Sequence, residues 1–304
     1  MLGAATLAAS VACSQQAPPP SAAQSPPPPA RSSAPDQPAA AAQSAAQRSF
    51  EQLEKSFESR LGVYAVDTGN GAVVSYRADE RFAYASTHKA FVAAAVLQRT
   101  AIPELSTQVP FGPADLVDGA PITHDHVGAG MTVRELIDAA VRYSDNTADD
   151  LLFREIGGPG GLATFLRGIG DTTSHVDRIE PALNVTAPGD IRDTTTARAF
   201  AADLRAVVLG TVLPDDRRAV LTDMMRANTT GDTVIRAGVP AGWQVADKTG
   251  NGGYYATRND IAVVWPPGRP PLVIVIFSDR SGKGDKADDR LIAQAAAAVV
   301  TVFR

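Results

Sequence analysis

The sequence is short of several features, and each shortage narrows the class of protein. Only one cysteine, Cys13, occurs in 304 residues, so the fold must be stable without a disulfide inside the chain. Basic residues are outnumbered by acidic ones, and the formal net charge of −5 argues against binding to nucleic acid or to an anionic membrane. No segment reads as a transmembrane helix. A small-molecule or neutral partner fits this composition better, although the composition identifies none.

The first thirteen residues are predicted to be a leader. Met1 to Ala12 form an apolar run that is too short to span a bilayer and is typical of a signal peptide, although a basic start is missing. Ser10-Val11-Ala12-Cys13 resembles a bacterial lipoprotein cleavage site, with serine where leucine is usual. Two alternatives stay open: Cys13 carries a lipid, which would be the route of membrane attachment, or it is discarded with the leader. Both predict an exported protein, in the periplasm, at the cell surface or secreted.

Residues 14–43 are almost entirely Ala, Pro, Ser and Gln and include four consecutive prolines, Pro26 to Pro29. Such a composition cannot bury apolar surface, so we expect a disordered linker. Residues 44–304 are then the folded part, long enough for one large domain or two small ones.

Strand patterns lie at both ends of this folded part. A helix is predicted over 45–59, where Phe50, Leu53 and Phe57 recur at helical spacing. Strands are predicted over 61–67 and 72–77 around a Gly-Asn-Gly turn, then over 258–265 and 271–278, followed by a helix over 285–302. Between them, helices are predicted over 88–98, 133–143, 146–156 and 195–209.

This order predicts an α/β fold in which one antiparallel sheet, completed by the two ends, is flanked by N- and C-terminal helices. The α/β part would comprise 44–82 and 228–304, with an all-α subdomain inserted over 83–227. A cleft between two such parts is a usual place for a functional site.

The first motif with chemical potential is Ser86-Thr87-His88-Lys89, which opens a run of good helix formers. Three residues apart at a helix start, Ser86 and Lys89 lie about one turn apart on one face, so the amine can reach the hydroxyl. The helix N-terminus also favours a developing negative charge. Taken alone, the motif is more typical of a Ser86 helix N-cap and a solvated Lys89.

Two further motifs argue against a purely structural role for Ser86 and Lys89. Ser144-Asp145-Asn146 lies between two predicted helices, and Lys248-Thr249-Gly250 follows the apolar stretch around Trp243. In this order, S-x-x-K, S-D-N and K-T-G are the signature of penicillin-recognising serine enzymes.

A fourth segment distinguishes among these enzymes. Arg178-Ile179-Glu180-Pro181-Ala182-Leu183-Asn184, followed by Pro188 to Thr196, resembles the Ω-loop of the class A serine β-lactamases. With flanking pieces such as Asn259-Asp260-Ile261, the resemblance covers roughly residues 45 to 304. It implies the β-lactamase/transpeptidase-like fold and hydrolysis of the β-lactam amide of penicillins or cephalosporins through a serine acyl-enzyme, giving antibiotic resistance.

The resemblance implies a role for each residue that matches a motif. Ser86 would be the nucleophile, and Lys89 would accept its proton or tune the network. Glu180, with Asn184, would hold the catalytic water that attacks the ester, and Ser144 would relay a proton to the leaving nitrogen. Whether Lys89 or Glu180 is the acylation base stays open. The Glu180-Pro181 bond is expected to be cis, and Arg178 and Asp193 are expected to form a salt bridge that closes the loop.

The resemblance also implies the substrate contacts. Asn146 would bind the side-chain amide of the substrate, and Lys248 and Thr249 would face its carboxylate. The backbone N–H groups of Ser86 and Asn251 would form the oxyanion hole. Gly250, like Gly252, would let a flat substrate lie against the strand.

Two departures from the family pattern bear on the substrate. Gly119 stands where many relatives have an aromatic residue at the cleft mouth. The positions from which relatives present an arginine to the substrate carboxylate hold Thr257, Val234 and Asp289, and the neighbouring Arg258 is expected to point to the opposite face. Carboxylate recognition would then rest on Lys248, Thr249 and Ser144.

Three alternatives remain to be tested. A penicillin-binding transpeptidase or carboxypeptidase would share Ser86 and Lys89 but lacks the Glu180 segment. A β-lactam sensor would stay acylated and would need a membrane partner segment. A metal hydrolase would use His124, His126 and His175, but the complete ligand spacing is missing. We therefore expect no metal, no cofactor and nothing that requires more than a monomer.

Overall fold

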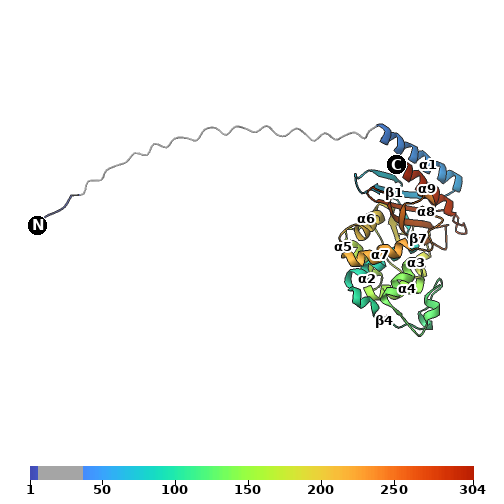
Figure 1. Cartoon of the computed structure of the whole chain (residues 1–304), viewed down its shortest axis with the longest axis horizontal. Coiled ribbons are helices and arrows are strands. Elements are labelled where there is room, and N and C mark those ends of the chain that lie inside the picture. Colours follow the sequence, from blue (N-terminus) through green and yellow to red (C-terminus); the bar gives the residue numbers. More distant parts are fainter. Residues whose placement is uncertain (6–36) are drawn as a thin grey trace. The chain divides into compact units, whose positions relative to one another are not determined.

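The computed structural model describes residues 1–5 and 37–304 and divides the chain into two units, Met1–Pro35 and Asp36–Arg304 (Figure 1). Residues 1–5 are exposed and have no regular secondary structure. Cys13 and positions 14–36 of the predicted linker lie outside the described residues. In the part of the chain that is described, no helix combines the length and apolar character that crossing a bilayer requires.

The end of the predicted linker is a correction. Helix α1 spans Gln37–Phe57, so positions 37–43, expected to be disordered, are helical. Alanine is the strongest helix former, and this stretch is rich in it. The helix is also tied to strand β2, because Gln43 and Gln47 donate side-chain hydrogen bonds to the carbonyls of Val73 and Ser75. The composition resembled a linker, but packing against the sheet favours the helix.

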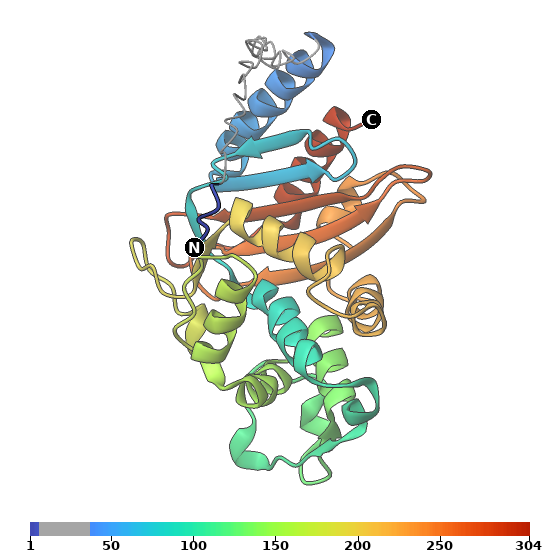
Figure 2. The ribbon, with the colours of Figure 1, turned by 90° about the vertical axis from the view of Figure 1, so that its left-hand side faces the viewer.

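Five antiparallel strands form the central sheet, in the order β2-β1-β9-β8-β7 (Figure 2). The strands are β1 (Arg60–Asp67), β2 (Val73–Tyr76), β7 (Gln244–Asn251), β8 (Arg258–Trp265) and β9 (Leu272–Asp279). The prediction that the two ends of the chain complete one sheet is therefore confirmed. Strand β1, from the N-terminal part, pairs along its whole length with β9, from the C-terminal part.

The alternation of side chains along a strand places one hydrophobic core on each face of this sheet. On β9, Leu272, Ile274 and Ile276 join the core that includes residues of α1 and of the C-terminal helix α9 (Asp289–Val302). Val273 and Phe277, on the other face, join the larger core that contains the remaining major helices. Helix α9 begins later than the predicted position 285, because Asp288 caps it by accepting a hydrogen bond from the backbone of Arg290.

The larger core is built mainly from the helices between residues 89 and 226. These are α2 (Lys89–Arg99), α3 (Val133–Arg142), α4 (Asn146–Ile156), α5 (Gly158–Gly168), α6 (Ala197–Val208) and α7 (Asp215–Arg226). The short α8 (Ile235–Gly238) joins the other core, with α1 and α9. Helix α6 packs against β9, β8 and β1, whereas α2, α3 and α4 pack mainly on one another. Most of the helical region thus forms a layer that adjoins the sheet, as Figure 2 shows.

Two short two-stranded ladders lie outside the central sheet. Strand β3 (Arg81–Ala83) pairs with β6 (Thr194–Thr196), and β4 (Gln108–Val109) pairs with β5 (Met131–Thr132). Because positions 194–196 are extended, the helix predicted over 195–209 begins only at Ala197, where Thr196 is its N-cap. Sequence analysis did not predict these ladders.

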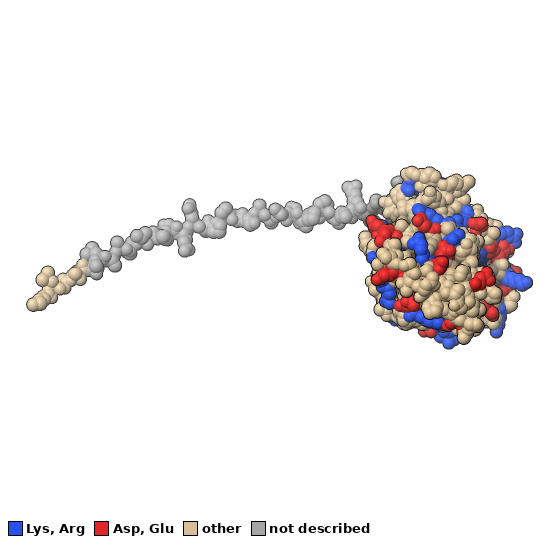
Figure 3. Space-filling model, turned by 60° about the horizontal axis from the view of Figure 1, so that its bottom comes forward, with Lys and Arg blue, Asp and Glu red and all other residues tan. Residues whose placement is uncertain are grey.

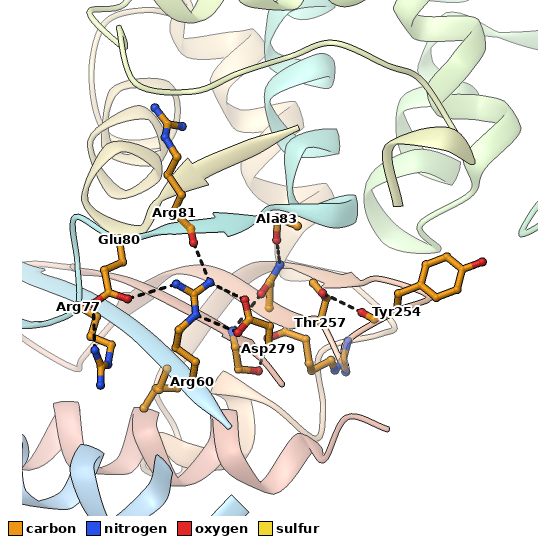
Figure 4. A network of polar contacts seen from close by, with 12 residues as sticks. Arg60, Arg77, Glu80, Arg81, Ala83, Tyr254, Thr257 and Asp279 are labelled. Carbon is orange, nitrogen blue, oxygen red and sulfur yellow. Dashed lines mark hydrogen bonds and ion pairs between the residues drawn. The ribbon is translucent and has the colours of Figure 1, made fainter. Parts of the chain in front are cut away.

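A network of ion pairs fixes β3 to the sheet. The guanidinium of Arg60 on β1 lies between the carboxylates of Glu80 and Asp279 and also donates to the carbonyl of Arg81 (Figure 4). The chain that leaves β3 leads directly into the segment that carries Ser86. Figure 3 shows acidic and basic residues interspersed on the face it draws.

Candidate active site

Ser86 lies in a tight turn at the start of the helix that the sequence predicts. A 3-10 turn, η1 (Ala85–His88), precedes α2, and Ser86 is 7% exposed within it. The turn is held by the Thr87 hydroxyl, which donates to the carbonyl of Tyr84 over 2.7 Å. No side-chain hydrogen bond caps η1 or α2, so Ser86 is not a helix N-cap, the structural role that the isolated motif would suggest.

Lys89 is completely buried and its ammonium has three acceptors. Its Nζ lies 3.0 Å from the carbonyl oxygen of Ser144, 2.5 Å from Oδ1 of Asn146 and 3.1 Å from Oε1 of Glu180. The Ser86 hydroxyl lies 3.5 Å from the same Oε1, at the outer limit for a hydrogen bond. Lys89 and Ser86 therefore meet at one carboxylate oxygen of Glu180.

Glu180 is enclosed by the protein and held at three points. Its Oε2 accepts a hydrogen bond from Nδ2 of Asn184 over 2.6 Å, and its backbone N–H donates to Oδ1 of Asp150 over 3.0 Å. Burial, together with the neighbouring carboxylate of Asp149, raises the pKa of Asp150 to about 7. The Glu180-Pro181 bond is cis, as predicted.

The segment around Glu180 is closed by the predicted salt bridge. Nε of Arg178 lies 2.5 Å from Oδ2 of Asp193, whose other oxygen accepts from the backbone N–H groups of Asp177 and Arg178 and from the hydroxyl of Tyr84. Asp193 is therefore not the cap of the following helix, since Thr196 has that position.

Ser144 projects from the junction between α3 and α4. Its φ of 59° is left-handed, and Asp145, not Ser144, caps α4 by accepting from the N–H of Ala148. The Asp145 carboxylate also accepts from the backbone N–H groups of Ile122 and Thr123, which anchors the junction. Asn146 follows, with Nδ2 donating to the carbonyl of Asp118.

Lys248 on β7 reaches the same junction from the opposite side. Its Nζ donates to Oγ of Ser144 over 3.0 Å and to the carbonyl of Thr249 over 2.8 Å. Burial, assisted by the nearby charge of Lys89, lowers the pKa of Lys248 to about 7. The Thr249 hydroxyl lies 2.6 Å from that of Thr230.

Gly250 allows close packing within the chain, whereas the sequence predicted that it makes room for the substrate. A Cβ at this position would stand 2.8 Å from the carbonyl oxygen of Tyr84 and 3.2 Å from the amide nitrogen of Thr87. Strand β7 and turn η1 therefore pack backbone to backbone, which only glycine permits. At Gly252, a Cβ would meet the side chain of Thr257 at 2.8 Å. Both glycines are explained by packing within the chain.

The expectation for Arg258 is wrong. Arg258 pairs directly with Asn251 across β7 and β8, so the two side chains share a face of the sheet. Arg258 and Asn251 both line the cleft that also contains Ser86. Thr257, the neighbour from whose position the opposite direction of Arg258 was predicted, does not line it. The guanidinium of Arg258 is held by the carboxylate of Asp289, at 2.6 Å from Oδ1 and 3.0 Å from Oδ2. The strand register, which the sequence did not specify, decides this.

The predicted residues meet at one cleft of about 860 Å³. Among the residues that line it are Ser86, Ser144, Asn146, Asn184, Thr249, Asn251 and Arg258. Lys89, Glu180 and Lys248 lie beneath this surface, each no more than 3% exposed. Gly119 also lines the cleft; its φ of 84° favours glycine, and a Cβ there would lie 2.7 Å from Nδ2 of Asn146.

The histidines that suggested a metal site do not assemble one within residues 1–5 and 37–304. His124 and His126 lie in a surface turn, and neither they nor His175 join a cluster of three ligand groups. His88, Asp149 and Glu180 do bring ligand atoms within 4.8 Å of one another. Both ring nitrogens of His88, however, are already hydrogen-bonded to protein oxygens.

Comparison with known proteins agrees with this geometry. The model of a family described as the β-lactamase enzyme family matches residues 45–303. A β-lactamase of Amycolatopsis lactamdurans is 54% identical over 259 residues, which are 85% of this chain and 85% of that protein. A β-lactamase of Bacillus amyloliquefaciens is 52% identical over 249 residues, 82% of this chain and 81% of the relative.

Solved structures give the same result. A class A β-lactamase from Clostridium kluyveri superposes with a TM-score of 0.83 at 47% identity, covering 84% of this chain and 98% of the other. A halotolerant bacterial β-lactamase superposes with a TM-score of 0.81 at 51% identity, with the same coverage.

Proposed function

Because the chain belongs to the class A serine β-lactamases, which hydrolyse the β-lactam amide through a serine acyl-enzyme, we propose that Ser86 carries the acyl group. In acylation, Oγ of Ser86 bonds to the lactam carbonyl carbon, and the carbon–nitrogen bond breaks. The serine proton leaves through Lys89 or Glu180, and the departing nitrogen gains a proton. The activity confers resistance to β-lactam antibiotics.

The placement of Glu180 is the observation that carries this proposal. One carboxylate oxygen faces Ser86 and Lys89, and the other is held by Asn184. A water between Glu180, Asn184 and the ester carbonyl would lose a proton to the carboxylate as its oxygen bonds to the carbonyl carbon. The ester bond then breaks, and Oγ of Ser86 regains a proton. This second step separates a β-lactamase from an enzyme that stays acylated.

Ser144 is assigned to protonation of the leaving nitrogen. Its hydroxyl accepts a hydrogen bond from Lys248 over 3.0 Å, so its own proton is free to be donated into the cleft. Lys89 holds the backbone carbonyl of the same residue. Proton transfer from a positioned side chain is worth about 10²- to 10⁴-fold in rate.

The remaining cleft residues are assigned to substrate binding. Lys248 and Thr249 would bind the substrate carboxylate, and the corrected placement of Arg258 adds the cationic group that many relatives provide. Asn146 would bind the side-chain amide. The N–H groups of Ser86 and Asn251 would stabilise the oxyanion, with Gly250 keeping the two segments together.

The proposal extends to the whole chain. Residues 1–13 would act as an export leader, with a lipid on Cys13 as one outcome, and the segment that follows would tether the catalytic domain outside the cytoplasm. The all-α part and the sheet part would meet at the cleft, and the domain would act as a monomer.

Intact mass of the full chain mixed with benzylpenicillin, recorded beside absorbance at the lactam band, tests the proposal. Rapid ring opening with a transient mass gain is expected, and Ser86→Ala should show neither. Glu180→Ala should accumulate the acyl adduct. A persistent adduct on the unaltered chain would favour the sensor or transpeptidase alternatives, and labelling of Ser86→Ala would remove the nucleophile assignment.

A further inference from the structure

His88 is a fully buried, titratable side chain that the proposed mechanism does not use. It lies directly beneath the cleft, between Ser86 and Lys89 in the chain, and is 1% exposed. Its ring is enclosed by Tyr84 and Phe153, with ring centroids 5.4 and 5.5 Å away. A buried imidazole needs partners for both nitrogens, and the identity of those partners defines what it does.

Both partners of His88 are acceptors. Nδ1 lies 2.7 Å from the carbonyl oxygen of Ala85, and Nε2 lies 2.8 Å from Oδ2 of Asp149 on α4. A carbonyl oxygen cannot donate, so Nδ1 carries a proton and donates it to Ala85. Nε2 and the Asp149 carboxylate then share one further proton. Burial alone would lower the pKa of His88, but the carboxylate of Asp149 raises it overall.

The carbonyl that His88 holds belongs to the peptide that joins Ala85 to Ser86. In a planar trans peptide, the C=O and N–H groups point in opposite directions, so fixing the Ala85 carbonyl fixes the direction of the Ser86 N–H. Hydrogen bonding to the carbonyl also polarises the N–H and strengthens it as a donor. Ala85 has a φ of 46°, a left-handed conformation that surrounding contacts must maintain.

We propose that His88, oriented by Asp149, is a positioning residue that holds the Ala85–Ser86 peptide with its N–H directed at the substrate oxyanion. This inference rests on the proposed function, because it assigns the Ser86 N–H to the oxyanion hole. His88 contacts no reacting atom. It acts from behind the peptide, on the side away from the cleft, and Asp149 fixes the ring from the adjoining helix.

The effect of His88 must be separated from any effect of Glu180, because a carboxylate oxygen of Glu180 lies within 4.8 Å of a ring nitrogen of His88 and of a carboxylate oxygen of Asp149. Acylation is therefore measured in a Glu180→Ala background, where any difference between variants cannot pass through Glu180. The chain is mixed with benzylpenicillin, quenched in acid at set times, and the acylated fraction is read by intact mass over a range of penicillin concentrations. This gives the maximal acylation rate and the apparent affinity separately.

His88→Phe keeps an aromatic ring between Tyr84 and Phe153 but removes the hydrogen bond to Ala85. Loss of one oxyanion donor costs about 10²- to 10³-fold, and a misdirected donor next to an intact Asn251 should cost roughly 10- to 100-fold in maximal acylation rate. The apparent affinity should stay unchanged. Asp149→Asn leaves Nδ1–H of His88 in place, because the asparagine amide can donate to Nε2. The maximal acylation rate of this variant should therefore fall only about 3-fold.

Phe153→Leu is the matched control, because it loosens the packing around His88 without touching its hydrogen bonds. Equal acylation rates for His88→Phe and its parent, or an equal loss in Phe153→Leu, would overturn the proposal. Absence of acylation in the unaltered chain as well as in the parent would instead count against the proposed function. If His88→Phe does not fold, ¹⁵N chemical shifts of the His88 ring in the unaltered protein decide, because an unprotonated Nδ1 would also rule the proposal out.

Discussion

Nζ of Lys248 lies 3.0 Å from Oγ of Ser144, and the lysine is completely enclosed by protein. Burial and the charge of Lys89 bring the pKa of Lys248 to about 7, so a group assigned to carboxylate binding titrates near neutral pH. The lysine is charged below this pKa and neutral above it, whereas the substrate carboxylate stays ionised throughout. Loss of the positive charge should weaken binding as pH rises.

We therefore expect kcat/KM to fall as pH rises above about 7, with kcat less affected, because kcat/KM reports ionisations of the free enzyme. Lys248→Arg should flatten this limb, since a guanidinium stays charged. Steady-state rates from pH 6 to 9 with a carboxylate-bearing penicillin would check this. A kcat/KM that is constant across that range in the unaltered protein would contradict the assignment.

Arg258→Ala tests the corrected position of the arginine. The change should lower kcat/KM by roughly 10- to 100-fold, chiefly through KM, because a charge-assisted hydrogen bond contributes about 1.5–3 kcal/mol. Arg290→Ala provides the control, since Arg290 is an arginine paired with Asp288 that does not line the cleft. Equal KM values for the two variants would show that Arg258 does not contact the substrate.

Gly250→Ala tests the close packing of β7 on η1. The added methyl group would stand 2.8 Å from the carbonyl oxygen of Tyr84, so β7 and η1 must move apart. Such overpacking costs about 1–3 kcal/mol of stability, and kcat/KM should fall with it. Gly253→Ala is the matched change in the same cleft, because its Cβ would meet nothing within 4 Å. Gly250→Ala should unfold at a lower temperature and turn over substrate more slowly than Gly253→Ala. Equal unfolding temperatures and turnover rates for the two variants would contradict the packing argument.

Asp203 gives a prediction on stability, away from the cleft. Burial on α6, together with the neighbouring Asp171, raises the pKa of Asp203 to about 9, whereas an unfolded chain would titrate near 3.8. The folded state therefore binds more protons between these values. This contribution to stability is complete below about pH 4 and is lost as pH rises towards 9, by up to about 1.4 kcal/mol per pH unit.

Asp203→Asn should remove this dependence, because an amide needs no proton to be buried. The variant should gain stability relative to the unaltered protein as pH rises from 5 to 8.5, measured by urea unfolding. Asp215→Asn is the control, because the Asp215 side chain is 94% exposed. Parallel pH dependences for the unaltered and Asp203→Asn proteins would refute the prediction.

Local patterns predicted the parts of the site that depend on local geometry. The spacing of Ser86 and Lys89 placed both at a helix start. The Arg178–Asp193 pairing and the cis Glu180-Pro181 bond were implied by the resemblance of one contiguous segment to the Ω-loop of the family. The ends of the sheet were also predictable, because strand alternation and a glycine-rich turn are short-range signals. Each of these features needs information from only a few neighbouring residues.

Features that depend on distant contacts were missed. The orientation of Arg258 follows from its register with Asn251, which is set by pairing across the whole of β7 and β8. Strand β6 is extended because β3, more than a hundred residues earlier in the chain, pairs with it. The role of Gly250 required knowledge of the backbone of Tyr84 on the opposite side of a contact.

The position of β7 has a consequence for the behaviour of the protein in concentrated solution. β7 is one of the two edge strands of the five-stranded sheet, and exposed strand edges invite pairing with strands of other molecules. Here η1 and α7 pack on this strand. The turn that presents Ser86 therefore also holds an edge strand in place, so a change that opens the contact at Gly250 should free β7 for pairing between molecules and promote aggregation as well as impair catalysis.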